Sequence, residues 1–282
     1  MYRSDVKITR MRPHIGIIVI GDEILSGKRA DKHLPKVIDL LAARGLPLAY
    51  AEYVGDDPAR ITATLARAFA AARLSGDIVF STGGIGATPD DHTRQCAARA
   101  LGVELALHPD AKRLIEERMR DTAREQGTVF EPDRHDNLHR LNMGVFPVGA
   151  EIIPNPYNKI PGFTLGSVHF VPGFPVMAWP MMEWVLDQHY PHLFRQAAYM
   201  EKSVIVFGAM EATLTPLMED IERDHPGIKV FSLPSVDHPE YGRHIDLGVK
   251  GDPVRTEAAF VQLLTGLAGF GVKLGPELVR KG

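Results

Sequence analysis

Residues 77–95, DIVFSTGGIGATPDDHTRQ, decide the fold and the candidate site. The mostly apolar run from Asp77 to Ser81 is typical of a buried strand, and the turn that follows holds Thr82 and three glycines, Gly83, Gly84 and Gly86. Glycine takes left-handed backbone angles and lets a ligand come close to backbone N–H groups. No lysine follows Gly86, as it would in a GxxxxGK[ST] phosphate loop, and the spacing is not GxGxxG. The stretch therefore predicts a strand followed by a ligand-binding turn of neither common type.

A helix is expected directly behind this turn. Thr88 suits the N-cap, Pro89 suits the first helical position, and the pattern continues to about Ala100. The unpaired N–H groups and the dipole of a helix N-terminus favour an anion. Turn and helix together predict a site for a phosphate group.

The acidic pair Asp90–Asp91 has two interpretations. Thr88 and Asp91 match a T-x-x-D capping box, with Asp90 complementing the helix dipole. In the other interpretation a carboxylate at the mouth of the phosphate site holds a divalent metal or activates a water molecule. Two acids beside an anion repel it unless a cation lies between them. The spacing alone does not choose between the two.

A second strand end also delivers acids after a glycine. The apolar run from His14 to Ile20 predicts a strand covered on both faces, and it ends in Gly21, Asp22 and Glu23. In open α/β sheets, ligands bind at the carboxyl ends of the strands. We therefore expect Asp22, Glu23, Asp90 and Asp91 to share one cation, with Mg²⁺ or a similar divalent ion as the first candidate and K⁺ as a further one.

The segment GGIGATPDDHT resembles the GGxGxTxDDxT signature of the molybdopterin-binding (MoCF) family, in the form seen in competence/damage-inducible protein A (CinA) and in the N-terminal domain of eukaryotic FAD synthases. IGDEILSGK and VGDD resemble further motifs of this family. So do three later segments that the resemblance implies close over a nucleotide-like ligand, with Asn155, Pro161, Gly162, Pro172 and Gly173 as ligand-binding residues.

This chain departs from the family pattern at several of these positions. Met177 stands where the family has the glutamate of PGxPxE, Asn158-Lys159 replaces a Gly-Thr pair, and His33 stands where asparagine is frequent. A methionine cannot bind a metal through oxygen as a carboxylate does. The resemblance therefore implies either an altered substrate or a loss of activity.

The resemblance and the element order predict two domains. Residues 13–195 are expected to form an α/β fold of MoCF type, a three-layer, mostly parallel sheet with a β-excursion over 143–175. Residues 200–275, in the order βαββα, are expected to form a small α+β domain similar to the middle domain of CinA. It has no GXXG loop, so RNA binding is not expected. The C-terminal amidohydrolase domain of CinA, which deamidates nicotinamide mononucleotide, is expected to be absent.

Composition restricts the partners and the compartment. A net charge of −3 over 282 residues gives no electrostatic case for nucleic acid or anionic membrane, and no apolar run reaches the roughly 18 to 20 residues of a membrane span. Met1 to Arg12 is polar, lacks the apolar stretch of a signal peptide, and is expected to be a mobile lead-in. The single cysteine, Cys96, is expected to pack in the interior, which is compatible with a reducing cytoplasm.

Two further features have structural interpretations. His135 and His139 are spaced to share a metal on a helix, but no third ligand accompanies them, so we expect a polar surface. The Met- and Trp-rich stretch at 177–186 is expected to be core or interface. Together with the family resemblance, it leads us to expect a homo-oligomer, a dimer or a trimer.

Three functions stay open at this point. The first is a metal-dependent nucleotide pyrophosphatase acting on an ADP-ribose- or FAD-like diphosphate, with Asp90, Asp91 and Asp22 as catalytic residues. The second is a molybdopterin-binding or adenylyl-transfer protein of molybdenum-cofactor biosynthesis. The third is a non-catalytic relative that binds a nucleotide. All three predict a small nucleotide-like or pterin ligand and a cytoplasmic protein.

Overall fold

The computed structural model describes residues 13–195 and 199–281, which fall into two compact units. The first unit comprises residues 13–41 and 47–191, and the second comprises 42–46, 192–195 and 199–281. The expected lead-in at residues 1–12 lies outside the described residues.

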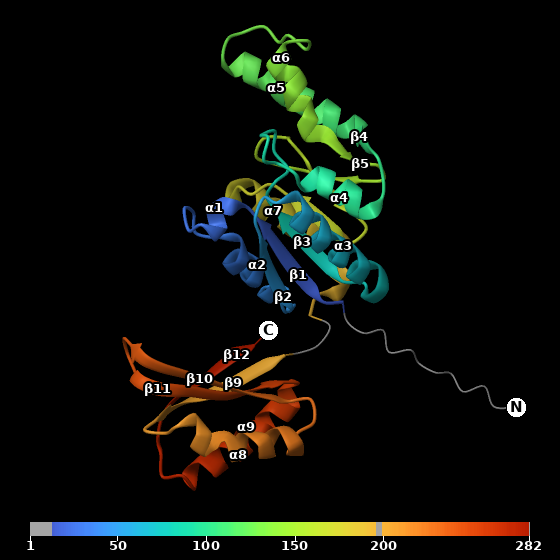
Figure 1. The fold of residues 1–282 in the computed structure, drawn as a ribbon. Coiled ribbons are helices and arrows are strands. Elements are labelled where there is room, and N and C mark those ends of the chain that lie inside the picture. Colours follow the sequence, from blue (N-terminus) through green and yellow to red (C-terminus); the bar gives the residue numbers. More distant parts are fainter. Residues whose placement is uncertain (1–12, 196–198, 282) are drawn as a thin grey trace, which may run out of the picture. The chain divides into compact units, whose positions relative to one another are not determined.

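The first unit is built on a six-stranded sheet in the order β2-β1-β3-β8-β7-β6 (Figure 1). The first four strands in this order pair in parallel, whereas β7 and β6 are antiparallel to their neighbours, so the expected mostly parallel sheet is confirmed. The strands of this sheet are β1 (Ile15–Ile20), β2 (Tyr50–Val54), β3 (Ile78–Thr82), β6 (Glu151–Ile153), β7 (Gly162–Leu165) and β8 (Val168–Val171).

Both faces of this sheet are covered. Ile18 and Ile20 of β1 belong to the same core cluster as Ile61 and Leu65 of helix α3 (Pro58–Ser75). Every residue of β1 is buried, including those that alternate with Ile18 and Ile20 and face the other side. A strand buried on both faces needs a layer of structure on each side, which gives the three-layer α/β architecture.

The other helices and a short strand pair either flank the sheet or extend from one end of the unit (Figure 1). Helix α2 lies in the connection between β1 and β2. Helix α7 contacts β8 and β6. The elements are α1 (Asp22–Leu25), α2 (His33–Ala42), α4 (Thr93–Leu101), β4 (Leu105–Leu107), α5 (Pro109–Glu125), α6 (His135–Leu141), η1 (Asn142–Gly144), β5 (Val145–Pro147), α7 (Pro175–His189) and η2 (Pro191–Leu193).

Several local expectations are confirmed by side-chain contacts. The Asp57 carboxylate accepts a hydrogen bond of 2.8 Å from the Arg60 amide and caps α3. Cys96 is buried, with its thiol 3.3 Å from the Pro58 carbonyl. The apolar residues of the 177–186 stretch are mostly core, because Met181 and Met182 are fully buried. Those two side chains therefore give no support to an interface, and the oligomer stays a prediction.

The expected start of the helix behind the glycine turn is wrong. Helix α4 begins at Thr93, not at Pro89. The Asp91 carboxylate accepts a hydrogen bond from the Thr88 amide, as in a capping box, but the Thr88 hydroxyl also donates to it, at 2.6 Å. The Asp91 amide donates to the Thr88 carbonyl and not to that hydroxyl. The motif closes a turn, and the chain enters the helix four residues later.

The second unit is a four-stranded antiparallel sheet in the order β10-β11-β9-β12, with two helices. The expected order βαββα lacks the last strand, whose pairing shifts register across Gly275-Pro276. Since proline cannot donate to a strand ladder, this dipeptide hides the strand in the sequence. The elements are β9 (Met200–Phe207), α8 (Glu211–Asp224), β10 (Lys229–His238), β11 (Gly242–Gly251), α9 (Pro253–Ala268) and β12 (Lys273–Lys281). In the described residues of both units, no helix has the length and apolar character needed to cross a membrane.

Candidate functional site

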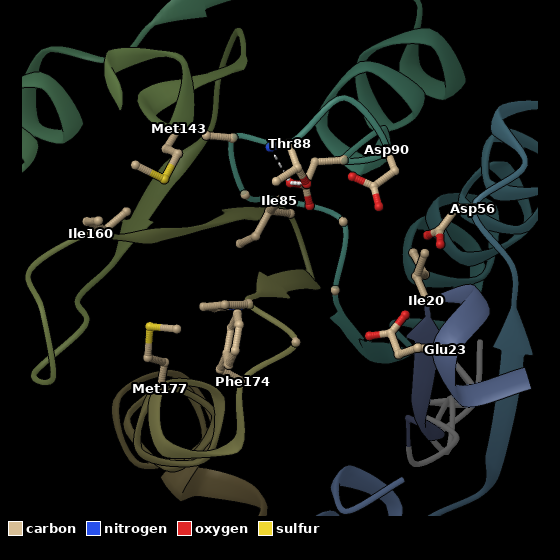
Figure 2. A pocket seen from close by; sticks show the side chains of 18 of the residues that line it. Ile20, Glu23, Asp56, Ile85, Thr88, Asp90, Met143, Ile160, Phe174 and Met177 are labelled. Carbon is tan, nitrogen blue, oxygen red and sulfur yellow. Dashed lines mark hydrogen bonds between the residues drawn. The ribbon is translucent and has the colours of Figure 1, made fainter. Parts of the chain in front are cut away.

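A cavity of about 420 Å³ lies at the carboxyl ends of the parallel strands (Figure 2). The ends of β1, β3 and β8 and the loop after β2 all contribute to its wall. Its lining is Ile20, Gly21, Glu23, Arg29, Asp56, Gly83, Gly84, Ile85, Gly86, Ala87, Thr88, Asp90, Asp91, Met143, Asn155, Asn158, Ile160, Pro161, Pro172, Gly173, Phe174 and Met177.

The glycine turn is held from behind by the start of α4. The Thr93 hydroxyl donates to the Gly83 carbonyl at 3.0 Å, and the Thr93 amide donates to the Gly84 carbonyl at 3.0 Å. The Arg94 guanidinium donates to the Gly86 carbonyl at 2.6 Å. These three contacts direct the carbonyls of Gly83, Gly84 and Gly86 toward α4.

The amides of the turn consequently face the other way. A trans peptide places each N–H opposite the preceding carbonyl, so the amides of Gly84, Ile85 and Ala87 face away from α4. Across residues 13–195 and 199–281, none of these amides has a hydrogen-bond acceptor. All three residues line the cavity. Ile85 is buried, and buried backbone N–H groups are almost always paired. Unpaired amides along the wall of a cavity are therefore the arrangement expected of an anion site.

Only glycine fits at the centre of this turn. Gly83 has a φ of 96°, and a Cβ there would lie 2.2 Å from the Ile20 carbonyl oxygen. A Cβ on Gly173, in the turn after β8, would lie 3.4 Å from the Cα of Gly83. The ends of three strands therefore approach one another at backbone contact distance, which brings their loops to one cavity.

Acidic side chains gather on one side of the cavity. Figure 2 shows Glu23, Asp56 and Asp90 reaching this side from three different segments of the chain. Burial raises the pKa of the Asp56 carboxyl. The hydrogen bond from the Asp22 backbone lowers this pKa, whereas the negative charges of Asp22, Glu23 and Asp90 raise it. The carboxylates lie close enough to repel one another. In the described part of the chain, however, no group of three or more His, Cys, Asp or Glu side chains is arranged to hold a metal ion.

Asp22 has a different position from the one expected. Its carboxylate accepts a hydrogen bond of 3.1 Å from the Asp56 amide, and the Asp56 carboxylate accepts one of 2.9 Å from the Asp22 amide. This reciprocal pair joins the end of β1 to the end of β2. Asp22 does not line the cavity, so it positions Asp56, a cavity residue.

The opposite side of the cavity is apolar. Figure 2 shows Ile85, Met143, Ile160, Phe174 and Met177 around this side. The Asn158 amide donates to the Met177 sulfur at 3.3 Å, so two of the positions that depart from the family pattern contact each other. Arg29 lies over the Phe174 ring at 5.9 Å from its centroid.

The structure brings most of the predicted site residues together. Those that line the cavity are Gly21, Glu23, Gly83, Gly84, Gly86, Thr88, Asp90, Asp91, Asn155, Pro161, Pro172 and Gly173. Thr82 and Gly162, like Asp22, lie outside the lining, and both are buried in strands. His135 and His139 are exposed on α6, away from the cavity, as expected of a polar surface.

Sequence reasoning missed other residues of the cavity. Asp56 carried a usable signal, because its VGDD motif places an acid after a glycine at a strand end, as the two selected motifs do. Arg29 and Met143 follow no pattern that marks a ligand site. Ile160 and Phe174 were not selected, although each stands directly beside a predicted ligand residue, Pro161 or Gly173.

Comparison with known proteins defines the class. Residues 16–195 match the family described as "probable molybdopterin binding domain", and the chain belongs to this family. Within it, the chain is similar to the CinA-like protein of Anaeromyxobacter sp. (strain K), at 32% identity over 217 residues that cover 73% of this chain and 49% of that protein. The CinA-like protein of Mycobacterium marinum is 31% identical over 226 residues, 77% of this chain and 52% of that protein.

A solved structure gives the same relationship. The crystal structure of CinA from Thermoplasma acidophilum, described as a protein with unknown function, shares 25% identity with this chain. It aligns with a TM-score of 0.51 over 62% of this chain and 97% of that one. The chain spans about half the length of the curated relatives it matches.

Proposed function

We propose that the cavity binds a small ligand that joins a phosphate group to a flat ring system, a pterin of the molybdopterin type or an adenine nucleotide. The observation that carries the proposal is the row of free amides at Gly84, Ile85 and Ala87 on the cavity wall. Membership of the molybdopterin-binding family favours the pterin. A volume of about 420 Å³ lies within the roughly 300–1,000 Å³ of small-molecule sites.

The apolar side suits the ring of such a ligand. Phe174 is 55% exposed although it is a large aromatic side chain, and its ring lies at the cavity opposite Ile85 and Met143. An aromatic heterocycle stacked here would cover exposed apolar surface and gain the contacts that aromatic pairs and thioether–aromatic pairs provide. The phosphate would then extend toward the glycine turn.

A metal-dependent pyrophosphatase acting on an ADP-ribose- or FAD-like diphosphate is the second candidate, and the acidic side favours it. Glu23, Asp56 and Asp90 would repel an anionic ligand without a cation between them. Mg²⁺ is usually held by one or two carboxylates together with substrate phosphates and water, so these acids fit such an ion only in company with a ligand. When bound, the ion would polarise the phosphoryl group. Asp91 is engaged by Thr88 and would keep the turn in shape.

Calorimetric titration of the full chain tests the binding proposal. We expect heat with molybdopterin or ADP-ribose. Binding to a Phe174→Ala variant should be about 5- to 150-fold weaker, because loss of a stacked base costs about 1–3 kcal/mol. Phe270, exposed in the second unit, supplies the matched control Phe270→Ala, which should bind as the original chain does. Absence of heat with both ligands would overturn the proposal.

Turnover separates the two candidates. Hydrolysis of ADP-ribose or FAD that requires Mg²⁺ and falls at least a hundredfold in Asp90→Asn would establish the pyrophosphatase. The control Asp39→Asn removes an equal charge from an exposed position on α2. Binding of both diphosphates without turnover would leave a ligand-binding function without catalysis.

A further inference from the structure

A second cavity, of about 350 Å³, lies on the other side of the loop that carries the acidic pair. Its wall includes His92, Arg94 and Gln95 at the start of α4, with Leu105 and Val145 of the β4–β5 pair. Ala87, Thr88 and Asp91 line both cavities. This loop is therefore a common wall between the candidate site and the second cavity.

Arg94 brings a buried positive charge to this cavity. The residue is only 4% exposed, and its guanidinium donates to two neutral carbonyls, those of Gly86 and Asn142, each at 2.6 Å. Among the residues that the structure describes, no carboxylate lies within ion-pair distance of it. Asp91 is the acid that acts on it electrostatically, but the Asp91 carboxylate is bonded to Thr88.

A buried charge without a counterion is costly in free energy. Consistent with this, burial lowers the pKa of Arg94. The negative charge of Asp91 raises this pKa but does not offset the effect of burial. A guanidinium offers five N–H donors, and two carbonyl contacts leave donors for a further acceptor. The N-terminal end of α4 favours a negative charge at the same place.

We propose that the second cavity binds a small oxyanion, a phosphate or sulfate group, paired with the Arg94 guanidinium. The guanidinium N–H groups that the two carbonyls leave unused can donate to the oxygens of such a group. The anion would add an ion pair to a charge that is otherwise offset only by the Asp91 carboxylate, beyond ion-pair distance. Its source is either a free ion or the phosphate of a larger organic ligand. Because Arg94 also fixes the Gly86 carbonyl, an anion here would stabilise the glycine turn of the candidate site.

Thermal unfolding and calorimetry with inorganic phosphate test the proposal, with sodium chloride at equal ionic strength as reference. Gln95 is exposed and lines the second cavity but not the first. An acid in the first turn of a helix is well tolerated, so Gln95→Glu should fold normally while repelling the anion. We expect phosphate to raise the unfolding temperature of the original chain, and Gln95→Glu and Arg94→Met to bind phosphate at least tenfold more weakly. Arg99, exposed on the same helix, gives the control Arg99→Met, which should bind as before.

A second arm identifies the source of the anion. If Gln95→Glu weakens ADP-ribose binding along with phosphate, the site takes a phosphate of the organic ligand; if it weakens inorganic phosphate alone, the site takes a free ion. Absence of any phosphate effect on the original chain would overturn the proposal. So would unchanged phosphate affinity in folded Gln95→Glu.

Discussion

Replacing Gly83 by alanine should destabilise the first unit strongly. The residue has a φ of 96°, and holding a side-chain-bearing residue in such a region costs on the order of 1–3 kcal/mol. The new Cβ would lie 2.2 Å from the Ile20 carbonyl oxygen, a backbone atom that cannot rotate away. Forcing an extra carbon into packed structure adds on the order of 1–3 kcal/mol. The sum predicts a loss of about 2–6 kcal/mol in the free energy of unfolding.

A second glycine separates the two contributions. Gly76 also has a left-handed φ, 74°, but a Cβ there would meet no atom within 4 Å. Gly76→Ala should therefore carry only the conformational cost, about 1–2 kcal/mol. Urea unfolding followed by tryptophan fluorescence measures both, since Trp179 and Trp184 lie on α7 of the same unit. Equal losses in the two variants would show that the close approach of the glycine turn to β1 is absent, and the geometry of the cavity would fall with it.

Other predictions concern pH and helix ends. Burial lowers the pKa of His169 to about 3 from an ordinary value of 6.5. As the pH falls below 6.5, this histidine therefore becomes protonated in the unfolded chain but stays neutral in the folded chain until about pH 3. Lowering the pH from 6.5 to 5 should then cost about 2 kcal/mol of stability through this group. Urea unfolding at the two pH values should show a smaller loss in His169→Gln, and an unchanged loss would contradict the buried, neutral ring. Asp57→Ala and Asp252→Ala each remove an N-cap hydrogen bond and should each cost about 1 kcal/mol; no loss in either would argue against that cap.

Strands β1 and β3 were predictable because burial on both faces leaves mostly apolar runs. The excursion over 143–175 was predictable as a region of short strands, because glycine and proline interrupt its apolar residues. The start of α4 was not predictable, because a T-x-x-D sequence serves a capping box or a closed turn equally well. What decides is whether the Asp91 amide bonds the Thr88 hydroxyl or the Thr88 carbonyl, which the sequence does not record.

The two sides of the cavity also differ in how far the sequence predicts them. Its acids and glycines follow strand ends, where the chain pattern marks them. Its apolar side is not marked in this way, because Met143, Ile160 and Phe174 reach it from three separate segments of the chain. Isolated apolar residues in loops have no periodicity to distinguish a ligand contact from ordinary packing. Asp22 is the opposite case, a residue that the motif predicts for the site but that does not line the cavity. Its carboxylate accepts a hydrogen bond from the backbone amide of Asp56, and Asp56 lines the cavity instead.

The central claim is that the amides of the glycine turn bind the phosphate of a ligand. Amide resonances of the full chain, recorded by NMR with and without molybdopterin or ADP-ribose, test it most directly. We predict that the signals of Gly84, Ile85 and Ala87 shift on ligand addition and that their hydrogen exchange slows, while the amide of Gly83, already bonded to the Val171 carbonyl, exchanges as before. Ligand binding that leaves these three amides unshifted and unprotected would contradict the account.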